Sequence, residues 1–199
     1  QILYPVMEHF YTIQGEGFYS GHAAYFIRLG GCDVGCTWCD VKESWDADKH
    51  EKYSSLQILN WILESKARLC VITGGEPLMH DLSDLTNLLH KNHIQINIET
   101  SGTSPISGHL DWITFSPKRF KKALPEFFSC ANELKIIVAH QNDLRWGEDF
   151  ARELNSSCHL FLQPEWSKEK EILPIIINYV KSHPSWKISL QTHKYMGID

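Results

Sequence analysis

The sequence has no apolar run near the roughly 18–20 residues that a helix needs to cross a bilayer. Its first residues do not combine a basic segment with an apolar stretch, so no secretory signal is predicted. No repeat, low-complexity stretch or linker interrupts the 199 residues. We therefore expect a cytoplasmic protein with one domain over residues 1–199 and no membrane partner.

Positive charge is also scarce, with a formal net charge of -5. A nucleic-acid-binding protein normally carries a basic stripe, and here Lys and Arg are spread along the chain. The only local group lies at residues 118–122, and we interpret it mainly as a solvated face. The sequence therefore predicts no nucleic-acid partner.

The six cysteines are not spaced as a disulfide framework would require. Such a framework would also be unusual in a reducing compartment. Cys70, Cys130 and Cys158 occur singly, and we interpret them as small buried hydrophobic residues. The other three form a compact C-x-x-x-C-x-x-C motif of Cys32, Cys36 and Cys39.

Short β-rich segments alternate with helical patterns along the chain. The predicted strands lie around 22–29, 69–73, 94–98, 111–115, 134–138, 159–163 and 186–191, with an extended segment at 4–13. Helices are expected after a capping box at Ser54 and Gln57, and near 81–91, 143–154 and 168–182, the last kinked or restarted at Pro174. Several strands are mainly apolar on successive residues, which indicates burial on both faces. This pattern predicts an α/β fold with a mostly parallel sheet and right-handed crossovers.

Unusual segments follow four of these strands, starting with Gly30-Gly31-Cys32 and Gly74-Gly75-Glu76-Pro77. The others are residues 99–102 and 116–118. Ligands of parallel α/β folds gather at the carboxyl ends of the strands. We therefore expect these four segments to contribute to one binding region.

The three clustered cysteines suit either an iron–sulfur cluster or zinc, since thiolates are soft ligands. A structural zinc needs a fourth ligand, for which Asp33, Asp40 or His50 could serve. A cubane cluster held by three cysteines instead leaves one iron open, which favours chemistry over simple electron transfer.

Several motifs together resemble one enzyme family. The cysteine motif with an aromatic residue before its last cysteine, followed by residues 74–77, resembles the radical S-adenosylmethionine (SAM) superfamily. Residues 11–17, 24–32 and 189–199 further resemble the 7-carboxy-7-deazaguanine synthases, over nearly all of the chain from about Phe10. The resemblance implies a modified, incomplete (β/α) barrel, a [4Fe–4S] cluster, SAM and a homodimer.

The resemblance also implies the reaction. A 5′-deoxyadenosyl radical would remove hydrogen from C6 of 6-carboxy-5,6,7,8-tetrahydropterin, after which the ring contracts and ammonia leaves. The product would be 7-carboxy-7-deazaguanine, which feeds queuosine-type 7-deazapurines. An external one-electron reductant such as flavodoxin or ferredoxin would be needed.

Three polar residues suit a carboxylated pterin, two of them for its polar ring edge and one for its carboxylate. Gln14 offers a donor and an acceptor, Glu16 can accept from two N–H groups, and the planar fork of Arg28 can pair with a carboxylate. The alternatives are a polar hairpin turn for the first two and a surface ion pair for Arg28. The resemblance extends the predicted substrate site to Ile13, Gly15, Thr73, His193 and Asp199, the last through a terminal carboxylate.

The resemblance places other residues at SAM, with Glu99 as a possible ribose partner that could equally cap a turn. The predicted SAM residues are Trp38, Asp40, Gly74, Gly75, Glu76, Glu99, Ser101, Ser116, Lys118 and Gln163.

One position departs from the family pattern. Val41 stands where relatives usually carry a Thr whose hydroxyl helps to hold magnesium, so no protein ligand is predicted for that ion. Two other functions stay open as alternatives. One is a small radical SAM enzyme that activates a glycyl-radical partner, which would not need Gln14, Glu16 and His193. The other is a non-catalytic zinc or electron-carrier module.

Overall fold

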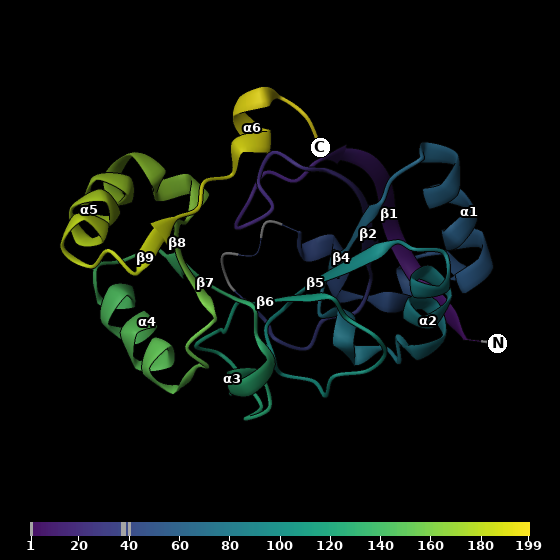
Figure 1. Ribbon diagram of the computed structural model, residues 1–199, viewed down its shortest axis with the longest axis horizontal. Helices are drawn as coiled ribbons and strands as arrows, with labels where there is room; N and C mark the ends of the chain where they lie inside the picture. Colours follow the sequence, from purple (N-terminus) through teal and green to yellow (C-terminus); the bar gives the residue numbers. More distant parts are fainter. Residues whose placement is uncertain (1, 37–38, 40) are drawn as a thin grey trace. The chain divides into compact units, whose positions relative to one another are not determined.

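The computed structural model describes residues 2–36, 39 and 41–199 (Figure 1). Strands and helices alternate along the described chain in the order β1 (Leu3–Ile13), β2 (Ala23–Leu29), β3 (Lys52–Ser54), α1 (Ser55–Ser65), β4 (Leu69–Gly74), α2 (Ser83–Lys91), β5 (Gln95–Thr100), β6 (Trp112–Phe115), α3 (Phe127–Cys130), β7 (Glu133–Val138), α4 (Asn142–Glu153), β8 (His159–Pro164), α5 (Glu169–Ser182), β9 (Trp186–Ile188) and α6 (Thr192–Met196). Short 3-10 helices lie at Lys42–Trp45, Ala47–Lys49, Pro77–Met79 and Trp166–Lys168. Among the described residues, no helix has both the length and the apolar character that crossing a membrane requires.

The internal contacts divide the chain into two compact units. Unit 1 contains the chain up to Thr12, together with Ala23–Ile113 and Pro117–Leu124. Unit 2 contains Ile13–His22, Thr114–Ser116 and Pro125–Asp199. Each unit therefore draws on segments that are distant in sequence.

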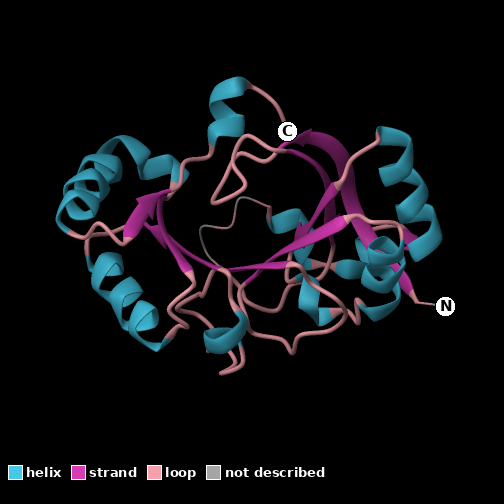
Figure 2. Cartoon of the chain, viewed as in Figure 1, coloured by secondary structure: helices cyan, strands magenta, loops and turns pink. Residues whose placement is uncertain are grey.

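Unit 1 is a mostly parallel sheet covered by helices. β1 pairs with β3 in antiparallel fashion, whereas β2 and β5 both pair with β4 in parallel. Helices α1 and α2 pack together beside the strands (Figures 1 and 2). The predicted capping box starts α1, with Ser54 accepting from the Gln57 N–H group. Ile27, Ile72 and Leu85 are fully buried in the core.

Unit 2 repeats the strand–helix alternation. β7 pairs in parallel with β8, and β8 pairs in parallel with β9. Helix α4 packs against β7, and α5 packs against β8 and β9 (Figure 1). Its core includes the fully buried rings of Phe115 and Phe127, stacked with centroids 5.5 Å apart.

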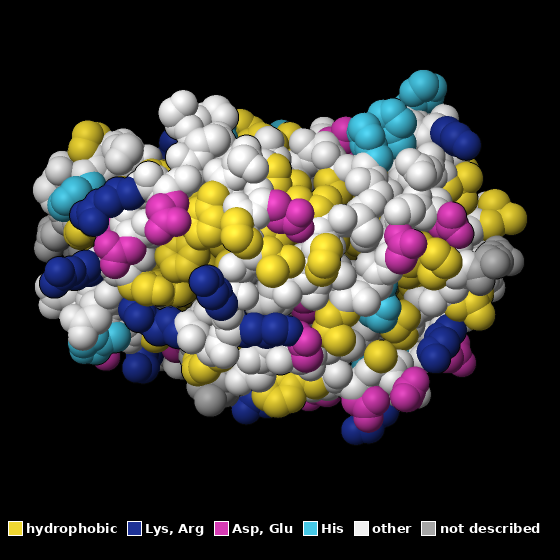
Figure 3. All heavy atoms as spheres, turned by 90° about the horizontal axis from the view of Figure 1, so that it is seen from below, with side chains coloured by type: hydrophobic (Ala, Val, Ile, Leu, Met, Phe, Trp, Pro, Cys, Tyr) yellow, Lys and Arg dark blue, Asp and Glu magenta, His cyan; other side chains and the backbone are white. Residues whose placement is uncertain are grey.

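The predicted elements are present, with one clear difference at the end of the chain. The last strand stops at Ile188 instead of residue 191, and the tail then turns into α6. The expected helix at 168–182 runs unbroken through Pro174. On the face shown in Figure 3, Lys and Arg side chains lie among Asp and Glu side chains and form no stripe.

Candidate active site

The cysteine loop of unit 1 rests on the two glycines at the end of β4, Gly74 and Gly75. The Gly75 N–H group donates to the Leu29 carbonyl at 2.9 Å, and the Glu76 N–H group donates to the Gly31 carbonyl at 2.9 Å. A Cβ atom on Gly75 would clash with the Gly31 carbonyl and lie 2.8 Å from the Cβ atom of Cys32. The glycine pair is therefore needed for close contact with the cysteine loop.

The three clustered thiols lie in a partly buried setting. Cys36 is buried, and Cys32 and Cys39 are half-buried. Burial raises the pKa of Cys32 and of Cys36, and the nearby Cys39 raises both further, while the Lys118 ammonium lowers the pKa of Cys36. Three mutually interacting soft donors in one loop fit an iron–sulfur cluster. Trp38 and Asp40, both predicted SAM residues, lie outside the described residues.

The other three cysteines lie outside this loop. Cys130 and Cys158 were predicted to be buried but are half-buried, and burial together with the nearby Cys130 raises the pKa of Cys158. Cys70 is fully buried in β4, and burial raises its pKa to about 12. All six cysteines lie in the described part of the chain, and each is a free thiol. The interpretation of Cys70 as a core residue is confirmed.

Two of the side chains considered as zinc ligands have other partners. Asp33 forms an ion pair with Lys121 at 2.5 Å. The Nε2 atom of His50 lies 2.9 Å from the Glu43 carbonyl oxygen, and its ring packs against Gly30. These contacts favour the cluster over zinc.

Glu76 holds together two of the predicted strand-end segments. Its buried carboxylate accepts from the Thr100 hydroxyl at 2.6 Å and from the Ser101 N–H group at 2.8 Å. The Ser101 hydroxyl and the Leu78 N–H group donate to it as well. The carboxylate of Glu76 therefore positions Ser101 beside the segment that carries Gly75.

A Gly75→Ala variant is expected to retain little iron after anaerobic reconstitution. The added methyl group would displace Gly31 and Cys32, whose backbone sets the direction of the first thiol. Iron per chain, measured with the visible absorption of the cluster, checks this result. Gly147→Ala is the control, because Gly147 has no positive φ and its added Cβ atom would come no closer than 3.1 Å to Ile136. Equal iron in both variants would show that the close packing is not needed.

The second set of candidate residues lies in unit 2, around the loop of residues 13–22. The Gln14 side chain is buried, and its carbonyl oxygen accepts from the Glu16 N–H group at 3.0 Å. The Glu16 carboxylate forms an ion pair with Lys135 at 2.5 Å and accepts from the Gln191 amide at 2.8 Å. Three distant segments thus meet at one carboxylate.

The charge of Glu16 is strongly stabilised. Burial alone would raise the pKa of Glu16, but the Lys135 ammonium, its hydrogen bond and the Gln191 amide outweigh burial and lower that pKa to about 2. Glu16 is therefore an ionised acceptor at neutral pH. Lys135, which is 4% exposed on β7, was not predicted as part of the site. A lysine within an otherwise apolar strand is the signal that could have indicated it.

The loop also docks on the segment after β9. The Thr192 N–H group and hydroxyl both donate to the Gly15 carbonyl, at 3.0 and 2.9 Å. A Cβ atom on Gly15 would clash with the ring of His193. The structure thus brings His193 beside Gly15, as expected for members of one site.

Ser189 links the same loop to β8. Its hydroxyl accepts from the Gly17 N–H group at 2.9 Å and donates to the Gln163 amide oxygen at 2.6 Å. The Phe18 N–H group donates to the buried Glu133 carboxylate at 3.1 Å. Neither Ser189 nor Glu133 was predicted from the sequence, because their partners in the loop of residues 13–22 lie more than 100 residues away.

The remaining predicted residues lie at strand ends and nearby turns. Arg28 and Thr73 are register partners on β2 and β4, and Arg28 forms an ion pair with Glu8 at 2.5 Å. In unit 1, Glu99 and Lys118 are half-buried; in unit 2, Ile13 is half-buried, Ser116 is buried and Asp199 is exposed.

Comparison with known proteins identifies this set of motifs. The protein-family model of the radical SAM superfamily matches residues 26–121. The 7-carboxy-7-deazaguanine synthase of Flavobacterium psychrophilum is 48% identical over 194 residues, covering 98% of this chain and 92% of that protein. The Escherichia coli K12 protein of the same name is 36% identical over 222 residues, covering 98% of this chain and 99% of that protein.

A solved structure agrees with these relatives. The crystal structure of QueE from Escherichia coli superposes with a TM-score of 0.86 at 34% identity, covering 96% of this chain and 94% of that chain. The α/β fold expected from the sequence is therefore confirmed. The chain belongs to the 7-carboxy-7-deazaguanine synthase family of radical SAM enzymes, which act in 7-deazapurine biosynthesis.

Proposed function

We propose that this enzyme converts 6-carboxy-5,6,7,8-tetrahydropterin to 7-carboxy-7-deazaguanine with loss of ammonia. The observation that carries this substrate class is the ionised Glu16 carboxylate, 14% exposed, beside the buried Gln14. Within the described part of the chain, Oε2 of Glu16 accepts from Lys135 and Oε1 accepts from Gln191, and a carboxylate oxygen has room for about two such bonds. Acceptor capacity therefore remains for the N–H groups of an aminopyrimidinone ring.

Cys32, Cys36 and Cys39 would hold a [4Fe–4S] cluster, which supplies the electron that cleaves SAM into methionine and a 5′-deoxyadenosyl radical. Gly74 and Gly75 pack closely against Leu29 and the cysteine loop, and we assign their backbone to the SAM site. Glu76 fixes Ser101, so the two segments can contact SAM together. We assign Glu99, Ser116, Lys118 and Gln163, with Trp38 and Asp40, to the same cofactor.

On the substrate side, the Arg28 guanidinium would bind the pterin carboxylate next to Thr73. It would either keep its ion pair with Glu8 or give it up. Ile13, Gly15 and His193 would line the pterin. We keep Asp199 in the substrate set as an additional acceptor.

The direct test is mass spectrometry after anaerobic incubation of the reconstituted enzyme with the carboxytetrahydropterin, SAM and a reductant. Substrate and product differ only by ammonia, so the hydrogen atom taken from C6 must be returned before the product leaves. We therefore expect more 7-carboxy-7-deazaguanine than 5′-deoxyadenosine. Formation of 5′-deoxyadenosine without any deazapurine would contradict the proposed substrate. Glycyl-radical formation on a partner protein would instead support an activating enzyme.

Magnesium is expected to matter less here than in relatives that carry Thr at position 41. Val41 has no side-chain oxygen, and its carbonyl already accepts from the Ser44 hydroxyl at 2.7 Å and the Ser44 N–H group at 3.1 Å. Mg²⁺ prefers oxygen ligands in near-octahedral geometry. Titration of activity with Mg²⁺ after chelator treatment should show weak dependence, and Val41→Thr should strengthen it. An absolute requirement in the unaltered chain would point to Asp40 as the ligand.

We further propose that the enzyme works in the cytoplasm as a homodimer of single-domain chains, reduced by a flavodoxin or ferredoxin. The formal net charge of -5 supports a small-molecule substrate.

A further inference from the structure

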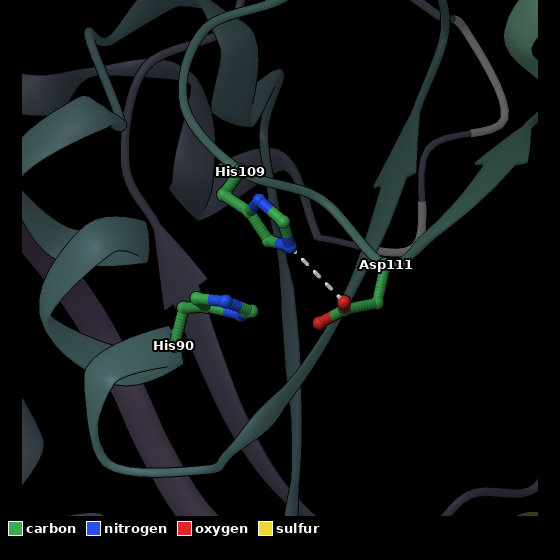
Figure 4. A group of neighbouring side chains, drawn as sticks. All are labelled: His90, His109 and Asp111. Atoms are coloured by element: carbon green, nitrogen blue, oxygen red, sulfur yellow. Dashed lines mark hydrogen bonds and ion pairs between the residues drawn. The ribbon is translucent and has the colours of Figure 1, made fainter.

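A group of three metal-binding side chains lies in unit 1, apart from the cysteine loop in sequence. His90 belongs to the last turn of α2, and His109 and Asp111 precede β6. All three are exposed, and their ligand atoms lie within 4.8 Å of one another. Figure 4 shows the three side chains directed toward a common point. Two imidazoles and one carboxylate are a donor set that zinc uses in proteins.

The geometry is close to that of a bound ion. The Nε2 atom of His109 lies 3.2 Å from the Oδ1 atom of Asp111. Bonds of about 2.0–2.1 Å in a tetrahedral site place neighbouring ligand atoms about 3.3–3.4 Å apart. The His90 ring lies beside the His109 ring, with centroids 3.9 Å apart and a tilt of 39°. An exposed ring can rotate by the small amount that brings its nitrogen to the same ion.

Asp111 is held in place by the neighbouring strand. Its Oδ2 atom accepts from the Ile96 N–H group at 2.8 Å, and its own N–H group donates to the Ile96 carbonyl at 2.9 Å. This pair of bonds fixes the carboxylate and leaves Oδ1 directed at His109. Such a supporting bond is typical of carboxylates that bind metal.

His109 is also positioned by buried structure. The backbone N–H group of His109 donates to the hydroxyl of the fully buried Thr86 at 2.9 Å. That hydroxyl in turn donates to the Leu82 carbonyl at 2.8 Å. The preceding Gly108 has a φ of +78°, and an added Cβ atom there would clash with the Thr86 hydroxyl. The turn that presents His109 is therefore set by α2, the same helix that carries His90.

We propose that His90, His109 and Asp111 bind a zinc-class divalent cation on the surface of unit 1, with water completing the coordination. The ion would link the end of α2 to the segment that enters β6. Its role is structural, since both anchored ligands are fixed before the ion arrives. No step of the proposed pterin reaction depends on this site.

The test uses the holoenzyme with its iron–sulfur cluster in place, so that the cluster cysteines do not compete for zinc. The protein is equilibrated anaerobically with Zn²⁺, and zinc and iron per chain are measured after exhaustive dialysis. His109→Ala and His90→Ala are the variants, each on a different segment. His183→Ala is the matched control, because His183, like His90, lies at the C-terminal end of a helix and next to another ring, that of Tyr179, with centroids 4.0 Å apart.

We expect the unaltered protein and His183→Ala to retain one zinc more than either site variant, at equal iron content. Zinc K-edge absorption should show nitrogen and oxygen near ~2.0–2.1 Å and no sulfur near ~2.3 Å. Zinc should also raise the melting temperature of the unaltered holoenzyme but not of His109→Ala. Equal zinc in all four proteins, or sulfur around the additional ion, would overturn the proposal.

Discussion

Replacing Cys36 by Ala is expected to remove most bound iron and all cleavage of SAM. The buried thiol of Cys36 is one of only three donors in the cysteine motif, and two thiolates cannot hold a cubane cluster securely. Iron and sulfide per chain after anaerobic reconstitution, together with 5′-deoxyadenosine formation under reduction, measure both effects.

Cys70→Ala is the matched control for this experiment. Cys70 is fully buried within β4, away from the cysteine motif in sequence. Burial raises the pKa of its thiol, which therefore stays protonated. Its loss should lower stability by a small-cavity cost of about 1 kcal/mol and leave the iron content unchanged. Full iron and SAM cleavage in Cys36→Ala, or iron loss in Cys70→Ala, would mean that the cluster ligands are wrongly identified.

Glu16→Gln is expected to abolish most product formation while SAM is still cleaved without coupling to substrate. The amide would place a donor where the proposed pterin N–H groups need an acceptor. It would also leave the buried Lys135 ammonium without its ion-pair partner, which costs roughly 3–5 kcal/mol of stability. Product and 5′-deoxyadenosine are quantified in the same reaction, and urea unfolding gives the change in stability.

The double variant Glu16→Gln with Lys135→Met separates the two effects. Removing both charges should recover part of the lost stability, since a buried ion pair can often be replaced by apolar packing at little cost. Product formation should not recover. If the double variant regains full turnover, Glu16 serves only to neutralise Lys135, and the loop of residues 13–22 is a structural turn.

The same carboxylate predicts a pH dependence of stability. The pKa of Glu16 falls from the usual 4.5 to about 2 in the folded protein, so the unfolded chain binds its proton more readily. Glu16 therefore stabilises the fold fully above about pH 4.5, and this contribution is lost as the pH falls toward 2. Acid unfolding curves of the unaltered protein and of Glu16→Gln should converge across this window.

Much of the fold could be predicted because its signals are local. The capping box at Ser54 and the apolar spacing of α2 gave their helices, and the buried runs gave β4 and β8. Pro174 was expected to kink or restart the last long helix, yet α5 runs through it. The tail after Ile188 was read as strand because nothing local distinguishes it from one, and the partners that redirect it lie at Gly15 and Gly17.

Sequence motifs indicated the candidate residues where one segment carries several of them, as in the cysteine loop and the glycines at 74–75. The contacts between segments that are distant in sequence could not be predicted in this way. The strand of residues 133–138 was read as apolar, although Glu133 and Lys135 point to one face of it and bond to the loop of residues 13–22. Sequence motifs also suggested Glu76 for the SAM site, but they did not indicate that its carboxylate accepts from Thr100 and Ser101.

The loop of residues 13–22 leaves the ribosome long before the residues that hold it. Lys135, Ser189 and Thr192 are bonded to it across 119 to 177 positions of sequence. At a synthesis rate of about 5–20 residues per second, Glu16 waits roughly ten seconds or more for its last partner. The loop is thus held by contacts between residues that are far apart in sequence, and such contacts form late in folding. Only a chain translated almost to its end can present Gln14 and Glu16 in their final arrangement, so nascent or prematurely terminated chains should be inert toward substrate.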